Sequence, residues 1–323
     1  VSLVTGDADW AGVGTVTDVI DDTILAFGHA MMGEGDASLP MAPGVVHTVV
    51  SNMVTSFKLG GATDVDAELV RDEFVGIVGR RGRTAARVPM SVDVRWAMDG
   101  RRQLLSYQLA RHEWWTPMLA GALVFESTLA LRMPPEPHHA TYVAEVDFGE
   151  LGTYRVDGAC SDFTMWDIEG AVTRPVAALA YNPLTEPVYP ESISLEVTFR
   201  EGSIARELLS LQLDAREYRP GETVRGELLT RPFRKPRATV AVAFDLPDDL
   251  PPGQYTLTAC DAATHVSAEM SDAPGRFDPR TPKELLRAVT FVNAARADRL
   301  YLRLPLGLTG VTAGMAELSE LPA

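Results

Sequence analysis

The sequence contains no long apolar run, and this absence excludes one class of protein. Hydrophobic residues make up 46% of the 323 residues and charged residues 23%. No uninterrupted apolar stretch approaches the ~18 residues that a membrane-spanning helix requires. The composition therefore indicates a globular protein, and the sequence predicts no membrane span.

Cysteine is scarce as well. Cys160 and Cys260 are the only two, and they do not form the closely spaced pairs that bind zinc or carry redox chemistry. Two isolated cysteines in a chain of this length do not make a disulfide framework, although they could still pair with each other. We favour two buried thiols, and the sequence predicts no cofactor and no metal.

Basic residues are outnumbered by acidic ones. The chain has 29 Lys and Arg against 44 Asp and Glu, so its net charge is −15. The densest basic stretches, Arg80–Arg83 and Arg231–Arg237, lie between strand-like runs and contain a single aromatic residue, Phe233, and not the series of aromatic residues on which nucleotide bases stack. We interpret both as solvated loops, and the charge argues against nucleic acid as a partner.

The first part of the chain is predicted to be all β. Short apolar runs rich in Val, Thr and Ile, mostly with a period of two, are separated by glycines up to about residue 134. One helix is expected from Thr116, which would be its N-cap, with Pro117 as its first helical residue. Residues 1–134 are therefore predicted to form one domain.

A proline-rich linker at 132–140 leads into a second, α+β unit at 135–200. It should contain two strands around a turn at 149–152. A helix should follow, capped by Ser161 or Asp162, interrupted near Pro175 and ended before Pro183.

From 201 to 323, alternating runs recur about every ten residues with Pro-Gly turns between them, which is typical of an immunoglobulin-like β-sandwich. The predicted fold class is therefore mainly β in three units. The chain begins at Val1 without an initiator methionine or a signal peptide, and we expect it to be a segment of a longer protein.

Four motifs in the first unit occur in a characteristic order. They are "GVGTVT" from Gly12, "AFGH" ending at His29, "SFKL" from Ser56 and "GIVG" from Gly76. Together they resemble the SpoIVB peptidase family of serine peptidases, over about residues 12–92. The resemblance implies a trypsin-like or related β-barrel at 1–134, and His29 as the general base.

The residues support part of that role. A histidine at the end of a strand, next to a glycine-rich loop, lies where β-barrel peptidases place their base, and a neutral imidazole can take a serine proton. The nucleophile segment of the family, of the type "GMSGSP", is missing. Ser203 in "EGSIA" and Ser161 in "GACSDF" are the closest glycine-neighboured serines, and neither is a convincing nucleophile.

Metal binding is the competing chemical interpretation of His29. Glu34, Asp36 and His47 follow it, but without the HExxH spacing of a zinc site. His138 and His139 are adjacent, so in an extended segment their rings point to opposite sides. We expect a linker role for that pair and no metal at either place.

Two functions remain open. The chain is either the histidine-bearing part of an exported serine peptidase whose serine lies on a separate segment, or a non-catalytic structural or interaction protein built on a peptidase-like barrel. The expected partner is a protein or peptide, which could be a separately cleaved fragment of the same precursor. An extracytoplasmic location is implied by the resemblance alone.

Overall fold

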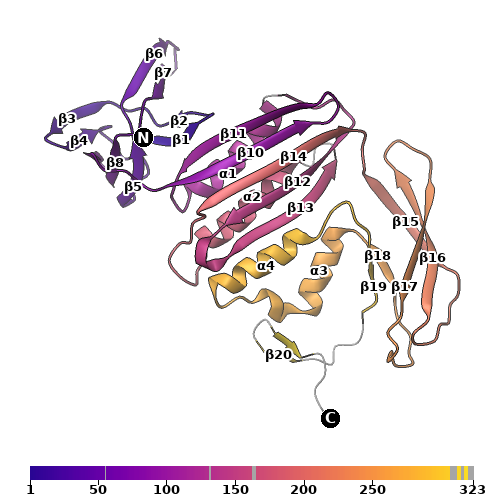
Figure 1. Cartoon of the computed structure of the whole chain (residues 1–323). Helices are drawn as coiled ribbons and strands as arrows, with labels where there is room; N and C mark the ends of the chain where they lie inside the picture. Colours follow the sequence, from indigo (N-terminus) through magenta and orange to yellow (C-terminus); the bar gives the residue numbers. More distant parts are fainter. Residues whose placement is uncertain (55, 131, 162–164, 306–310, 314–315, 319–323) are drawn as a thin grey trace.

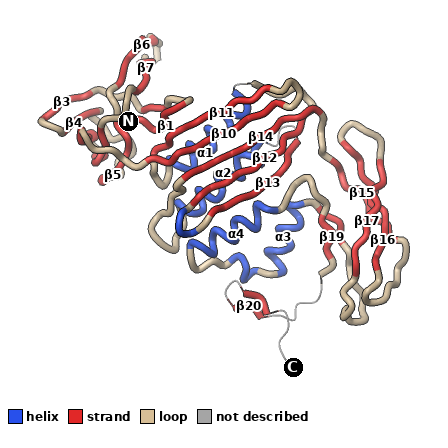
Figure 2. The backbone as a smooth tube through the Cα atoms, in the orientation of Figure 1, coloured by secondary structure: helices blue, strands red, loops and turns tan. Residues whose placement is uncertain are grey.

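The computed structural model describes residues 1–323 except 55, 131, 162–164, 306–310, 314–315 and 319–323. The fold is mainly β, as the sequence predicts, and its strands form several separate sheets (Figures 1 and 2). None of these sheets closes into a barrel within the described ranges. The strands of 1–134 are instead divided between an N-terminal unit and a large central sheet.

The N-terminal unit consists of a five-stranded antiparallel sheet and a separate two-stranded ribbon. In spatial order the sheet contains β3 (Val16–Ile20), β4 (Thr23–Ala26), β9 (Gly76–Arg81), β8 (Ala67–Glu73) and β5 (Gly35–Met41). The ribbon pairs β6 (Gly44–Val50) with β7 (Phe57–Ala62). Alternate residues such as Ile24, Leu39, Leu69 and Ile77 are buried between the sheet and the rest of the chain.

The central sheet has seven strands drawn from distant parts of the sequence. In order they are β13 (Thr153–Ser161), β12 (His138–Asp147), β14 (Ser192–Glu201), β10 (Arg87–Trp96), β11 (Arg101–Ala110), β1 (Ser2–Gly6) and β2 (Trp10–Ala11). Only the β10–β14 pair is parallel. The boundary expected at 134/135 therefore falls between strands that share one sheet and one core.

Helices α1 (Trp115–Phe125), α2 (Met165–Ala180) and α4 (Pro282–Ala294) pack against this sheet and against one another (Figure 1). A π-helical turn, Glu126–Ala130, continues α1. The expected helix near Thr116 is confirmed, but it starts at Trp115, so Thr116 is not its N-cap. The Thr116 hydroxyl instead donates to the Ala110 carbonyl (3.0 Å), a contact between helix and strand that the sequence does not reveal.

The expected helix in the second unit is also confirmed, with one correction. Pro175 lies inside α2 without interrupting it, because its neighbours Val172, Val176 and Leu179 are fully buried and that packing offsets the lost backbone hydrogen bond. Of the two expected caps, Ser161 is the last residue of strand β13, and Asp162 lies outside the described residues. The two predicted strands around the 149–152 turn are β12 and β13, with a 3₁₀ turn at Gly149–Leu151 between them.

The C-terminal part is less uniformly β than the sequence suggests. A three-stranded antiparallel sheet contains β15 (Arg206–Leu213), β16 (Thr223–Pro232) and β17 (Ala238–Asp245). It is followed by β18 (Thr258–Cys260), α3 (Ala262–Asp272), a 3₁₀ turn (Pro274–Phe277), α4 and β19 (Tyr301–Arg303). Two short strands, β20 (Val311–Ala313) and β21 (Ala316–Leu318), pair near the end.

Both α3 and α4 were missed by the strand pattern, although each has a local start signal. Asp261 caps α3 by accepting from the Thr264 backbone N–H (2.8 Å). Thr281 caps α4 by accepting from the Glu284 N–H (3.2 Å), with Pro282 as the first helical residue. The expected all-β sandwich at 201–323 therefore needs correction to a sheet followed by helices.

Candidate functional site

His29 lies directly after the end of β4, on a backbone that glycine makes possible. Phe27 and Gly28 have φ values of 74° and 73°, a left-handed conformation that is costly for most residues. The Phe27 ring packs on Gly14, where a Cβ atom would approach the ring to 1.9 Å. The glycine of "GVGT" thus makes room for the aromatic residue of "AFGH", so the two motifs form one local structure.

The glycine-rich loop after His29 is held by a single carboxylate. Asp72 on β8, only 3% exposed, accepts hydrogen bonds from the backbone N–H groups of Met31 (2.7 Å), Met32 (2.5 Å) and Gly33 (2.7 Å). Charged acceptors make the stronger hydrogen bonds in proteins. We call residues 29–34 the histidine loop, and Asp72 fixes its course.

The ring of His29 is exposed, and one of its nitrogens is engaged. Nδ1 lies 2.7 Å from the Ala30 carbonyl oxygen. A carbonyl only accepts, so Nδ1 carries the proton and Nε2 is the basic nitrogen of the neutral ring. Within the described part of the chain, no hydroxyl or thiol hydrogen-bonds to this ring. His29 therefore has the tautomer of a general base but no nucleophile beside it.

A second histidine ties the histidine loop to the central sheet. His112 Nε2 donates to Glu34 (2.7 Å), and its Nδ1 accepts from the backbone N–H groups of Trp114 (3.1 Å) and Trp115 (3.3 Å). Both ring nitrogens are occupied, which makes His112 a structural residue in the turn between β11 and α1.

Tyr189, whose ring lies beside Arg111, is not a general base. Arg111 stacks 4.7 Å above the ring of Tyr189, and burial raises the pKa of the Tyr189 phenol above its ordinary value. Its hydroxyl therefore stays protonated at neutral pH.

The two candidate serines meet each other and not His29. Ser161 Oγ lies 2.7 Å from Ser203 Oγ and accepts from the Ile204 N–H (3.2 Å). These contacts join the end of β13 to the turn between β14 and β15. The β3–β4 hairpin lies on the other side of the central sheet from β15 (Figure 1). Neither serine can therefore serve as nucleophile for His29.

The other metal and redox candidates take structural positions. His138 is buried, with its ring 6.0 Å from that of Phe199, and His139 Nδ1 lies 2.6 Å from the Gly202 carbonyl oxygen. Cys160 and Cys260 are both buried and are not joined by a disulfide. In the described ranges no three His, Cys, Asp or Glu side chains are grouped so as to hold a metal ion, and no helix is long and apolar enough to span a membrane.

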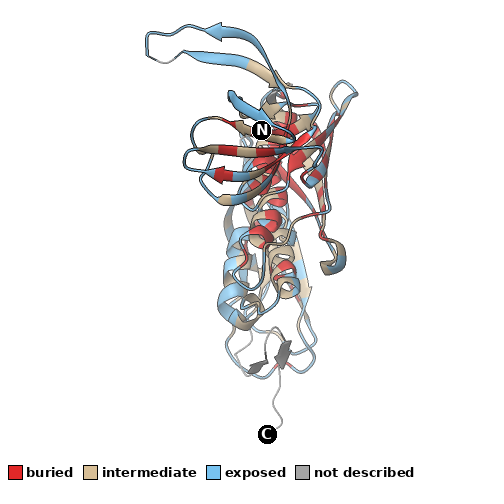
Figure 3. Cartoon of the chain, turned by 90° about the vertical axis from the view of Figure 1, so that its left-hand side faces the viewer, coloured by how far each residue is buried: buried red, intermediate tan, exposed pale blue. Residues whose placement is uncertain are grey.

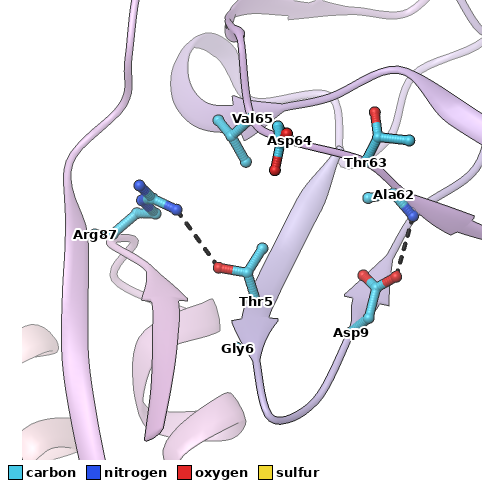
Figure 4. Close-up of a pocket in the computed structure, with 8 residues that line it drawn as sticks. All are labelled: Thr5, Gly6, Asp9, Ala62, Thr63, Asp64, Val65 and Arg87. Atoms are coloured by element: carbon cyan, nitrogen blue, oxygen red, sulfur yellow. Dashed lines mark hydrogen bonds between the residues drawn. The ribbon is translucent and has the colours of Figure 1, made fainter.

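A polar cleft of about 370 Å³ lies where β1 meets the base of the β6–β7 ribbon (Figure 4). Arg87 reaches across it toward the Thr5 hydroxyl (3.5 Å), and Asp9 accepts from the Ala62 N–H (3.1 Å). Thr63 and Asp64 complete the polar rim. His29 is not among the residues that line this cleft.

Comparison with known proteins adds no relative. No family model, no curated protein and no solved structure matches this chain. Any assignment of a function to this chain therefore depends on the sequence motifs and on the geometry around His29.

Proposed function

We propose that this chain is the histidine-bearing portion of an exported SpoIVB-like serine peptidase, with His29 as the general base. The observation that carries the proposal is the tautomer of His29. Its Nδ1–H donates to the Ala30 carbonyl, which leaves a basic Nε2 on an exposed ring at a strand end. The rigid histidine loop, fixed through Asp72, would hold that nitrogen in place for a nucleophile from another segment.

In this mechanism a serine on a separate fragment attacks the carbonyl carbon of a peptide bond. His29 Nε2 takes the hydroxyl proton as the C–O bond forms and then gives it to the leaving amine, so that an acyl-enzyme results. Water, deprotonated by the same nitrogen, releases the acid and regenerates the serine.

The oxyanion donors would have to come from the same fragment as the serine. Three backbone N–H groups of the histidine loop, those of Met31, Met32 and Gly33, already donate to Asp72 and are not free to bind a substrate oxygen. The fragment would therefore supply both the nucleophile and the oxyanion hole, as glycine-flanked serine segments do.

The finer fold assignments belong to the same proposal. The five-stranded sheet would be one part of a trypsin-like barrel that the serine fragment completes, and the sheet β15–β16–β17 would belong to an immunoglobulin-like module that presents or spaces the catalytic part. Export to an extracytoplasmic compartment is proposed from the resemblance alone.

The test is to label material from the native source with a fluorophosphonate serine-hydrolase probe and to measure the intact mass of every chain that co-purifies. We expect a co-purifying fragment to be labelled and His29→Ala to reduce labelling by at least about a hundredfold. His139→Ala, which removes an imidazole from the central sheet, is the matched control and should label normally. If no fragment is labelled, His29 is not a general base.

A non-catalytic interaction protein is the second candidate. It is favoured because no hydroxyl of the described chain hydrogen-bonds to the His29 ring, and by the apolar exposure of the N-terminal unit. This candidate predicts no labelling together with stable capture of a protein partner, an outcome that the same experiment detects by mass.

A further inference from the structure

The ribbon β6–β7 carries many exposed apolar side chains. Figure 3 shows it projecting from the N-terminal unit, exposed along most of its length. Eight apolar side chains of the segment 44–62, which we call the projecting ribbon, are 38–105% exposed: Val45, Val46, Val49, Val50, Met53, Val54, Phe57 and Leu59. A two-stranded ribbon with such exposure is marginally stable in water by itself. A contiguous exposed apolar surface of this kind marks a site that binds a partner.

The projecting ribbon carries almost no formal charge, and this bears on which partner can bind it. The chain has a net charge of −15, yet residues 44–62 include no acid and only one formal cation, Lys58. Because the chain as a whole is acidic, two copies repel each other on average. The projecting ribbon is a surface on which they can meet without that repulsion.

The backbone favours another strand over a lipid surface. Among the described strands neither β6 nor β7 has a third strand beside it. An open sheet edge is excluded from hydrocarbon, because its unpaired N–H and C=O groups would lose water without gaining a partner. The β7 side is approached by Asp9, which accepts from the Ala62 N–H, and by Thr15, which accepts from Lys58 Nζ (3.1 Å). The β6 edge is the more open of the two.

The sequence of β6 is complementary to itself. A register shift between Val46 and Thr48 leaves His47 without an opposite residue on β7, so the regular strand reads Val, Val, Thr, Val, Val in both directions. A two-fold axis at Thr48 would place Val45 opposite Val50 of a second copy, and Val46 opposite Val49. Cross-strand pairs of β-branched residues are a main source of sheet stability, and a two-fold interface requires this self-complementarity.

From these observations we propose that a second copy of this chain binds the projecting ribbon, with the β6 strands pairing antiparallel across a two-fold axis at Thr48. The result is a four-stranded sheet in the order β7, β6, β6, β7. The projecting ribbon has about 20 residues, at the lower end of the ~20–30 residues that each partner contributes to a standard interface. This pairing is independent of whether His29 takes part in catalysis.

The test is sedimentation of the whole chain from about 1 to about 100 μM, a range that resolves micromolar dimers. We expect a dimer whose affinity falls at least tenfold in Val49→Glu (57% exposed in β6) but not in Val16→Glu (53% exposed in β3). Mild oxidation should cross-link Thr48→Cys into a covalent dimer but should not cross-link Val19→Cys, whose cysteine lies outside the interface, and the native cysteines should not interfere because both are buried.

Three results would overturn the proposal. They are a monomer at every concentration, a dimer that Val49→Glu leaves intact, or a monomer that sediments with phosphatidylcholine vesicles. The last result would identify lipid as the partner of the projecting ribbon.

Discussion

Replacing Asp72 by asparagine should release the histidine loop while leaving the rest of the fold intact. Asparagine has nearly the same shape, but it has one acceptor oxygen and no charge. At least one of the three N–H groups now bound to Asp72 would face the amide NH₂, and the remaining bonds would become neutral ones.

The size of the effect follows from these bonds. A hydrogen bond to a charged group contributes about 1.5–3 kcal/mol, and a buried donor left without a partner costs about 1–3 kcal/mol. Because the histidine loop lies at the surface, water can replace part of what is lost. We therefore expect the free energy of opening this loop to fall by about 3 kcal/mol.

Amide hydrogen exchange measures this quantity residue by residue, which suits a chain of several units that need not unfold in one step. Protection of the Met31, Met32 and Gly33 amides should fall by about a hundredfold in Asp72→Asn, since each 1.4 kcal/mol is a factor of ten. Asp36→Asn is the matched control. It removes an exposed carboxylate on β5 that pairs with Arg71 at 3.3 Å, and such pairs contribute little. Equal exchange in the two variants would refute the role assigned to Asp72.

Two further changes test the packing and the charge network. Gly14→Ala would push a Cβ atom into the Phe27 ring, and thermal melting should show a loss of about 1–3 kcal/mol, the usual range for overpacking; an unchanged melting temperature would contradict the packing described. Burial by itself would raise the pKa of Asp93, but hydrogen bonds from Arg102 and Arg95 outweigh it and hold that pKa below its ordinary value. Its contribution to stability is therefore present above the unfolded pKa of about 4 and is lost as the pH falls through the folded value. Urea titrations of the native chain and Asp93→Asn should differ at pH 7 and converge as the pH falls below the folded pKa of Asp93.

Local patterns in the sequence predicted the parts of the site that neighbours in sequence create. The position of His29 at the end of a strand, next to a glycine-rich loop, follows from a stretch of about ten residues. Asp72 was missed because Arg71, Asp72 and Glu73 are all charged, so the sequence does not show which of them faces inward. The structure buries Asp72 between two exposed neighbours, where a carboxylate needs donors.

The helices of the C-terminal part show a different limit. The sequence "TPKE" from Thr281 to Glu284 has the form of a capping box, and Glu284 accepts from the Arg280 backbone N–H (2.8 Å). That signal identifies a helix start. It was overlooked because the preceding strands suggested that the same pattern would continue.

The sequence by itself determined that the protein is rich in strands, where its short hairpins turn, and that His29 follows a strand at the surface. These features depend on periodicity, glycine and turn chemistry within a few residues. Only the tertiary structure decided that β10 pairs with β14, that Ser161 meets Ser203 and that Asp72 holds the histidine loop. Such contacts join residues 40 to more than 100 positions apart. They are selected by the summed packing of whole sheets, which no local stretch encodes.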